Sequence, residues 1–223
     1  MIVPLTGPES LEVKKARLAE IMTILGPLYP DHKPLLDYTN PFQLLVATVL
    51  AAQCTDAAVN LITPVLFTRF PGPAALGEAP LAELETLIHS TGFFRTKARN
   101  IKELSRQLWD RHRGEVPQTM EELTALPGVG RKTAGVVLST FFNVPAIIVD
   151  THFSRVTRRL GLTESARSEG IERDIGAVTP KEQWTAVSQV LNRHGRFRCH
   201  ARKPLCGACG VTLQCPKLTI HKG

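Results

Sequence analysis

The sequence predicts an all-α protein. Apolar residues recur at helical spacing along nearly the whole chain, and residues that favour helix N-caps precede several of these segments. The only strand-like run is residues 145–150 (PAIIVD), which would serve equally well as a buried loop.

The first helix is predicted over residues 9–25. Ser10 is placed as its N-cap, and Gly26 with Pro27 would end it. The face expected to be buried consists of Leu11, Leu18, Ile21 and Met22.

The next predicted helix, within residues 39–53, is apolar nearly all round, as expected of a central buried helix. Asn40 is its predicted N-cap and Pro41 its first helical residue. Thr55 can cap the helix that follows, which Pro64 is expected to kink or divide.

Further helices are predicted over residues 81–90 and 96–114, the second stopped at Gly114. Two capping-box patterns predict additional helix starts. These are Thr119 with Glu122, and Thr179 with Glu182.

The positive charge is concentrated at one end of the chain. The net charge is +7, and residues 183–223 carry seven Lys or Arg and no Asp or Glu. Such a surplus favours a polyanionic partner, with nucleic acid first among the candidates. A merely solvated basic tail is the alternative.

The N-terminus has no basic region followed by a long apolar stretch, so no secretory signal is expected. The longest apolar run, residues 44–52, is too short to cross a bilayer. We therefore expect a cytoplasmic protein, associated with the nucleoid when bound to DNA, and no membrane partner.

Four of the five cysteines lie in the basic segment, separated by six, two and five residues, and Cys54 stands apart. The absence of an export signal argues against a disulfide framework. Four thiolates suit either structural zinc or an iron–sulfur cluster, and spacing alone slightly favours zinc. The four are Cys199, Cys206, Cys209 and Cys215.

The string LPGVGRKTAGVVL, residues 126–138, predicts a tight turn between two helices. Gly128 and Gly130 can both adopt positive φ, and neither has a side chain to block a close approach. The amides of the turn and of the following helix would then suit a phosphate oxygen. The string resembles the helix-hairpin-helix DNA-binding motif, although a hairpin without a ligand is the alternative.

Two residues near this turn are candidates for chemistry. Lys132 falls in the first turn of the second helix, where the helix dipole favours a neutral, nucleophilic amine while DNA phosphates would favour the charged form. Asp150 follows an apolar run and precedes an amphipathic helix. The alternatives are a phosphate-contacting lysine and an aspartate that only caps a helix.

Taken together, these strings resemble the endonuclease III family of base-excision DNA glycosylases with lyase activity, over about residues 36–215. The resemblance implies the helix-hairpin-helix glycosylase fold, a monomer, and two helical domains with a DNA-binding cleft between them. The expected domains are residues 34–144, a helical barrel, and residues 1–33 with 145–223, a cluster domain. The matching strings are AAQCTDAAVN (51–60), LPGVGRKTAGVVL (126–138), VDTHFSRVTRRLG (149–161) and HGRFRCHARKPLC (194–206).

The resemblance also implies roles for individual residues. Lys132 would attack C1′ of a flipped, damaged nucleotide in double-stranded DNA, and Asp150 would stabilise the developing positive charge. Gln53 would fill the vacated position, and Phe93 would be the wedge at the opposite strand. Phe94 is the other candidate wedge, and core packing is the alternative for both phenylalanines.

The cysteine spacing matches the [4Fe–4S] loop of that family, so the resemblance favours an iron–sulfur cluster over zinc. The family favours oxidised pyrimidines. The DNA contacts implied by the hairpin and the loop are Gly128, Val129, Gly130, Arg131, Arg196, Arg198, Arg202 and Lys203.

Three alternatives differ from this assignment. An adenine-specific glycosylase would need a glutamate in the string at residues 44–56, which has none. The oxoguanine branch shares the Lys/Asp pair but generally not the cysteine loop. A non-catalytic DNA-binding module would use Lys132 as a phosphate contact and Asp150 as a cap.

Overall fold

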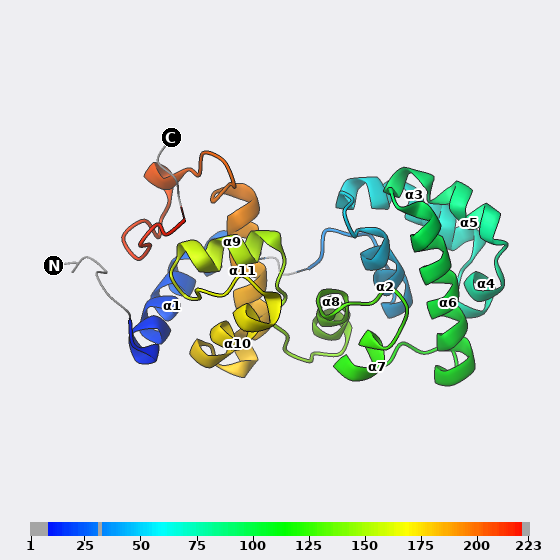
Figure 1. Cartoon of the computed structure of the whole chain (residues 1–223), viewed down its shortest axis with the longest axis horizontal. Helices are drawn as coiled ribbons and strands as arrows, with labels where there is room; N and C mark the ends of the chain where they lie inside the picture. Colours follow the sequence, from blue (N-terminus) through cyan, green and yellow to red (C-terminus); the bar gives the residue numbers. More distant parts are fainter. Residues whose placement is uncertain (1–8, 31–32, 220–223) are drawn as a thin grey trace. The chain divides into compact units, whose positions relative to one another are not determined.

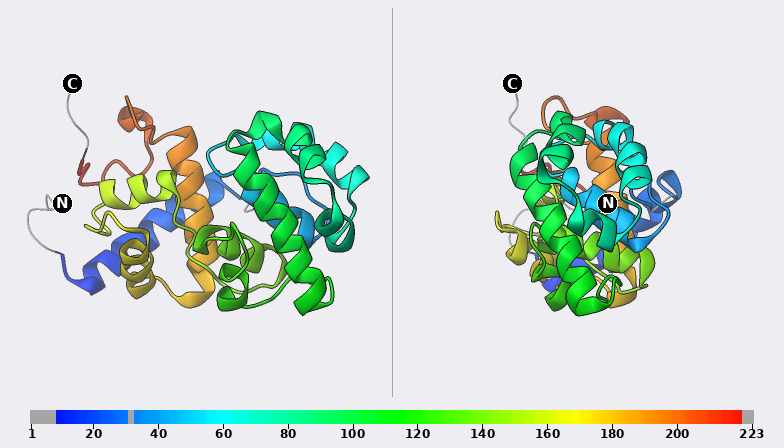
Figure 2. Two further views of the ribbon diagram at one scale, coloured as in Figure 1. Left: turned by 45° about the vertical axis from the view of Figure 1, so that its right-hand side comes forward. Right: turned by 90° about the vertical axis from the view of Figure 1, so that its right-hand side faces the viewer.

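The computed structural model describes residues 9–30 and 33–219, and within these ranges every regular element is a helix. Figures 1 and 2 show the helices within each part of the chain from three directions. Residues 145–150 form an irregular segment with Ala146, Ile147 and Ile148 buried, so the loop interpretation of this run is the correct one. No helix in the described ranges is long and apolar enough to cross a membrane.

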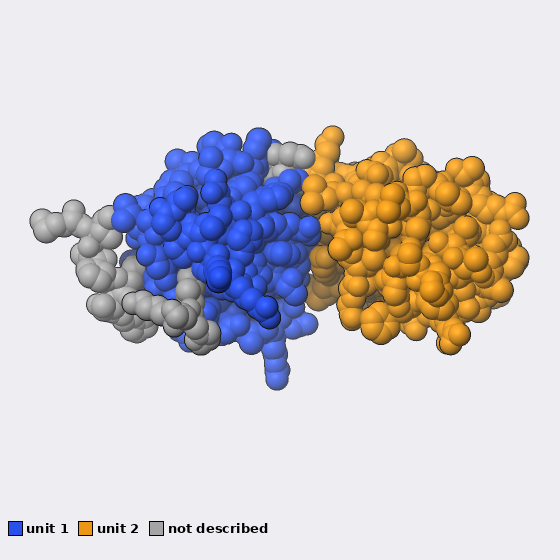
Figure 3. Space-filling model, turned by 90° about the horizontal axis from the view of Figure 1, so that it is seen from above, with its two compact units in different colours: residues 1–32, 145–223 blue, residues 33–144 orange. Residues whose placement is uncertain are grey.

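The chain divides into two compact units, one of residues 33–144 and one of residues 1–32 with 145–223, coloured separately in Figure 3. The first unit is built around α2 (Pro41–Leu50), which packs against α3 (Asp56–Arg69), α6 (Phe94–His112) and α8 (Arg131–Phe141). Its other elements are α4 (Pro73–Glu78), α5 (Leu81–Leu87), the 3₁₀ turn η2 (His89–Thr91) and α7 (Met120–Thr124).

The predicted start signals in this unit are confirmed. The Asn40 side chain accepts from the Gln43 amide at 2.9 Å, and Pro41 is the first residue of α2. Thr55 caps α3 and Thr119 caps α7 in the same way. Eight of the ten residues of α2 are buried, as its all-round apolar pattern predicts.

Pro64 does not divide α3, which runs through it as one helix. A proline ring already has helical φ, but inside a helix it removes one backbone hydrogen bond and crowds the carbonyl four residues earlier. The face of α3 that carries Val59, Leu66 and Phe67 is buried, and this packing offsets the loss.

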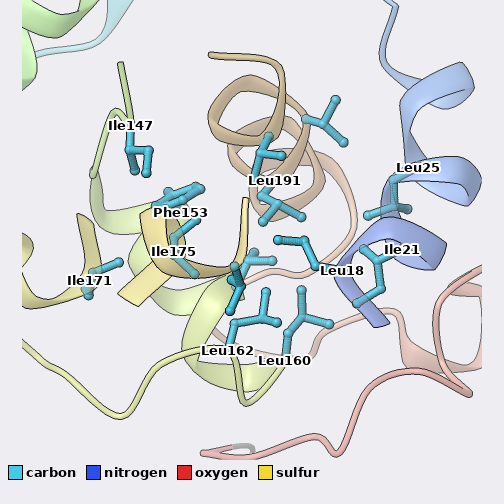
Figure 4. Packing of buried hydrophobic residues seen from close by; sticks show 14 of the residues in the cluster. Leu18, Ile21, Leu25, Ile147, Phe153, Leu160, Leu162, Ile171, Ile175 and Leu191 are labelled. Atoms are coloured by element: carbon cyan, nitrogen blue, oxygen red, sulfur yellow. The ribbon is translucent and has the colours of Figure 1, made fainter. Parts of the chain in front are cut away.

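The second unit contains α1 (Leu11–Leu25), α9 (Thr151–Arg159), α10 (Ser168–Val178) and α11 (Trp184–Phe197). Figure 4 shows their shared core, in which Phe153 of α9 is fully buried. Short 3₁₀ turns complete the unit: η1 (Gly26–Leu28), η3 (Lys181–Gln183) and η4 (Cys206–Ala208).

Two expectations for this unit are wrong. Leu11 was expected on the buried face of α1 but is 60% exposed, because the helix starts there and its first turn extends past the core. Thr179 caps no helix start: it ends α10, and the Thr179–Glu182 pattern leads into η3 before α11 begins at Trp184. Trp184 donates from its indole nitrogen to the Thr179 carbonyl at 3.0 Å, which holds this junction in its turn.

Candidate active site

The turn between α7 and α8 is the predicted hairpin. Leu126 accepts from the Val129 amide at 3.1 Å, and α8 begins at Arg131 with Gly130 as N-cap. Because Gly130 has no side chain, no N-cap group covers the amides of the first turn of α8. Val129, between the two glycines, is buried, so the turn directs an apolar side chain into the protein interior.

The two glycines serve different purposes. Gly128 has φ of +77°, and a Cβ there would lie 2.7 Å from Nδ2 of Asn100 on α6. Gly130 has φ of −93°, so Gly128 alone of these two glycines uses the positive φ that both could adopt. A Cβ at Gly130 would meet nothing within 4 Å, which leaves its outer face open to a ligand.

We therefore expect opposite results from two alanine substitutions. Gly128→Ala should lower the free energy of unfolding by roughly 2–3 kcal/mol, because it combines a left-handed alanine with a clash. Gly130→Ala should cost no more than about 1 kcal/mol, yet weaken binding to duplex DNA by placing a methyl group over the amides. Thermal unfolding and fluorescence-anisotropy titrations measure the two effects. Equal DNA affinity of Gly130→Ala and the unmodified protein would contradict a phosphate site here.

Lys132 is the second residue of α8 and is exposed, whereas the following residues Thr133–Leu138 are buried. The helix has no acidic residue in its first turn. The lysine is thus carried by a rigid buried helix, with its amine on the solvent side next to the glycine turn. Arg131 precedes it and is also exposed.

Asp150 is the N-cap of α9, as the helix-cap alternative predicts. Its Oδ1 accepts from the Phe153 amide at 2.8 Å. Its Oδ2 accepts from Asn192 Nδ2 at 2.5 Å, a contact that sequence reasoning missed. Lys132 and Asp150 lie in different units of the chain, orange and blue in Figure 3.

The loop that leads to Asp150 is pinned to α11. The Ala146 amide donates to Thr185 Oγ1 at 3.3 Å, and the Ile148 amide donates to Ser188 Oγ at 2.9 Å. These side-chain acceptors replace the strand partner that an extended run would otherwise need. They hold the segment of the loop around Ala146 and Ile148 against α11.

Gln53 and Phe93 both occupy exposed turns with left-handed backbone, at φ of 54° and 48°. Phe93 is 68% exposed, so core packing is the wrong interpretation for this residue. Phe94 is half-buried, with its ring centroid 4.4 Å from that of His89. Phe93 is therefore the phenylalanine available to a partner, at a backbone conformation that is costly for an aromatic residue.

Lys97 connects these two turns, and it was not singled out from the sequence. Its side chain is buried, and Nζ donates to the carbonyls of Leu50 and Thr91, each at 2.8 Å. Leu50 ends α2 shortly before Gln53, and Thr91 shortly precedes Phe93. Burial lowers the pKa of Lys97. The available signal was a lysine at helical spacing from the apolar residues of α6.

The four cysteines of the basic segment line one pocket, together with residues from α9 and α11 that include Arg159 and His194. Burial, followed by neighbouring thiolates among other causes, raises the pKa of Cys215 and of Cys209. Within residues 9–30 and 33–219, no group of three or more His, Cys, Asp or Glu is arranged to hold a metal ion. Cys54 is not among the residues that line the pocket.

Buried cationic and imidazole groups hold this pocket. Arg159, 5% exposed, donates from Nη1 to Cys199 Sγ at 3.3 Å and to the His200 carbonyl at 2.7 Å. Burial lowers the pKa of His194 to about 4, so its ring is neutral at physiological pH. Its Nε2 lies 3.6 Å from Cys209 Sγ. The cysteine loop is therefore anchored to α9 and α11 through polar contacts that the cysteine spacing does not reveal.

The predicted basic contacts fall into two groups. Arg198, Arg202 and Lys203 are exposed around the cysteine loop, as a phosphate-binding surface requires. Arg196 is half-buried, and its Nε donates to Asn192 Oδ1 at 3.1 Å. Arg196 therefore contacts a side chain of the protein itself, whether or not it also contacts DNA.

Comparison with known proteins supports one family throughout. Residues 46–181 match the model of the HhH-GPD superfamily base excision DNA repair proteins. Endonuclease III from Synechocystis sp. is 52% identical over 204 residues, covering 91% of this chain and 93% of the relative. Endonuclease III from Escherichia coli is 41% identical over 91% of this chain and 96% of its own length.

Solved structures agree. A trapped endonuclease III–DNA covalent intermediate matches with a TM-score of 0.85 and 42% identity, over 93% of this chain and 96% of the other. A thermostable thymine-DNA glycosylase, at 23% identity and a TM-score of 0.80 over 93% of this chain and 97% of the other, supports the fold alone. With this identity spread over nine-tenths of its length, the chain belongs to the endonuclease III family of HhH-GPD superfamily base excision DNA repair proteins.

Proposed function

We propose that this chain is a bifunctional DNA glycosylase and AP lyase that acts as a monomer on damaged double-stranded DNA inside the cell. The observation that carries the proposal is the position of Lys132, exposed on the second residue of α8 directly after the Gly128–Gly130 turn. A lysine placed there for stability alone would oppose the helix dipole. Its substrate class is oxidised bases, with pyrimidines first.

In the proposed reaction, the neutral Lys132 amine attacks C1′ of the flipped nucleotide and the C1′–base bond breaks. The departing base takes up the proton that the attacking amine loses. The C1′–O4′ bond of the sugar ring then breaks, O4′ takes up a proton from water, and C1′ and the amine remain joined as a protonated Schiff base. Loss of the C2′ proton then supplies the electrons that expel the 3′ phosphate by β-elimination. A stacked base is out of reach of Lys132, so the nucleotide must leave the duplex first.

Asp150 would act by charge. Breaking an N-glycosidic bond builds oxocarbenium character on the sugar, which a nearby carboxylate stabilises. The N-cap contact to Phe153 and the contact to Asn192 hold both carboxylate oxygens, so the group is oriented before substrate arrives. The cap role observed in the structure and the proposed catalytic role are therefore compatible.

The exposed turns at Gln53 and Phe93 would occupy the space left by the flipped nucleotide and separate the opposite bases. Lys97 stabilises both turns because its Nζ donates hydrogen bonds to the carbonyls of Leu50 and Thr91. An aromatic ring at Phe93 could stack on the orphaned base. The hairpin amides at Gly128–Gly130 would grip a neighbouring phosphate.

The cysteine pocket fits an iron–sulfur cluster in its chemistry. Four thiol side chains line it and no carboxylate does, a donor set that suits iron–sulfur or zinc rather than a hard cation. Cys199, Cys206, Cys209 and Cys215 would be the ligands. A [4Fe–4S] cluster there would fix the loop that carries Arg198, Arg202 and Lys203, and these cations would then bind phosphate.

Metal analysis tests this assignment. The purified protein should be brown, with a broad visible absorption and about four iron atoms per chain. Cys206→Ala should lose the colour, weaken DNA binding and flatten its salt dependence. Cys54→Ala is the matched control and should retain the iron, because Cys54 lies outside the pocket. A colourless protein with stoichiometric zinc would refute the cluster.

The enzymatic proposal is tested by borohydride trapping on a duplex with a single abasic site. An active lyase gives a covalent protein–DNA adduct, and duplexes with different oxidised bases then rank the lesions. A folded protein that binds the duplex but gives no adduct would instead be the non-catalytic DNA-binding alternative.

A further inference from the structure

The side chain of Asn192 contacts Oδ2 of Asp150, the carboxylate oxygen that does not cap α9. It projects from α11, which packs against α9 (Figure 1), and it is half-buried. Its Nδ2 donates to Asp150 Oδ2 at 2.5 Å, while Asp150 Oδ1 accepts from the Phe153 amide at 2.8 Å. One carboxylate oxygen thus belongs to the helix cap and the other to Asn192.

The orientation of the Asn192 amide follows from its second partner. Arg196 lies one turn further along α11 and donates from Nε to Asn192 Oδ1 at 3.1 Å. Arginine nitrogens are donors only, so the amide oxygen must face Arg196 and the NH₂ group must face Asp150. The contact therefore places an amide donor on the carboxylate oxygen that the helix cap does not use.

We infer that Asn192 is a positioning residue for base excision. It holds the Asp150 carboxylate in the orientation in which the carboxylate can stabilise the positive charge that develops on the sugar. This inference rests on the proposed function, because it needs Asp150 to act in the reaction. Asn192 itself would touch neither the substrate nor the reacting atoms. Its effect would pass entirely through the carboxylate.

The control for this inference lies on the same helix. Ser188 is one turn before Asn192 on α11 and accepts from the Ile148 amide at 2.9 Å, so it supports the same loop without touching Asp150. Ser188→Ala removes the hydrogen bonds of Ser188 Oγ to the Ile148 amide and the Ala146 carbonyl. Asn192→Leu removes the hydrogen bond from Nδ2 to Asp150. Both variants therefore loosen the contact between the loop and α11. A merely structural role of Asn192 would make the two variants behave alike.

Single-turnover excision of an oxidised pyrimidine tests the inference. Asn192→Leu should slow excision roughly 10- to 100-fold, the expected effect of a lost hydrogen bond to a charged group. Asn192→Asp, which turns a donor into a second carboxylate, should slow it more. DNA affinity and trapping on a preformed abasic site should stay close to the unmodified values, and Ser188→Ala should excise normally.

A double-mutant comparison separates the inference from the proposed function. Adding Asn192→Leu to Asp150→Asn should cause no further loss of excision, because the carboxylate it serves is already gone. Additive losses, or an Asn192→Leu rate equal to that of Ser188→Ala, would overturn the inference while leaving the glycosylase assignment intact. If Asp150→Asn excised normally, the proposed role of Asp150 itself would fail.

Discussion

Lys132→Ala is expected to abolish the covalent adduct with abasic DNA and to lower lyase activity by at least about 10³-fold, because the covalent route loses its nucleophile. The substitution should leave the fold intact. Lys132 is exposed at the start of α8, and the residues that bury this helix begin at Thr133. The free energy of unfolding should change by no more than about 0.5 kcal/mol.

Lys132→Arg distinguishes the nucleophile from a phosphate contact. Arginine keeps the positive charge but does not form a Schiff base under these conditions, since its guanidinium stays protonated. We expect near-normal DNA affinity and no adduct from this variant. Borohydride trapping and anisotropy titrations on one duplex give both readouts. Trapping by Lys132→Arg, or by Lys132→Ala, would mean that another amine is the nucleophile.

Asp150→Asn is expected to slow base excision by about 10²–10³-fold, the typical effect of removing one group that stabilises transition-state charge. Asparagine is as good an N-cap as aspartate. It therefore keeps the contact to the Phe153 amide, although its NH₂ group would then face the Asn192 NH₂ group. We expect a loss of stability below about 2 kcal/mol from these two opposed donors.

Asp150→Ala provides the comparison that separates capping from catalysis. It removes the cap as well as the charge, so it should be less stable than a well-capped variant by about 1 kcal/mol. If the carboxylate acts on the sugar, the Asn and Ala variants should excise equally slowly despite different melting temperatures. Excision rates that follow the melting temperatures, with near-normal rates at low temperature, would reduce Asp150 to a helix cap.

Local signals in the sequence predicted much of the fold correctly. Ser10, Asn40, Thr55 and Thr119 cap the helices they were expected to cap, because an N-cap depends on side chain and backbone only a few residues apart. The Thr179–Glu182 pattern predicted a helix start that the structure does not have. Thr179 is instead the C-cap of α10, which ends at Val178. A local capping pattern does not show whether a residue starts the next helix or ends the preceding one.

In the hairpin, too, the local sequence predicts some features and the tertiary structure decides others. Its string predicted the turn between α7 and α8, and Gly128 has the positive φ expected of it. Whether Gly130 also needed positive φ depended on how the chain enters α8, and there it is extended. The constraint at Gly128 is doubled by Asn100, which the tertiary fold brings beneath it.

The sequence by itself determined the helical class, the glycine hairpin, the lysine at the start of α8 and the cysteine set, because each is written in residues close together along the chain. Only the tertiary structure revealed how the candidate site is supported. Asn192 lies 42 residues from Asp150, Lys97 lies 47 residues from Leu50, and Arg159 lies 40 residues from Cys199. Contacts over such separations form only when helices pack, since no local periodicity specifies which polar side chains meet across an interface.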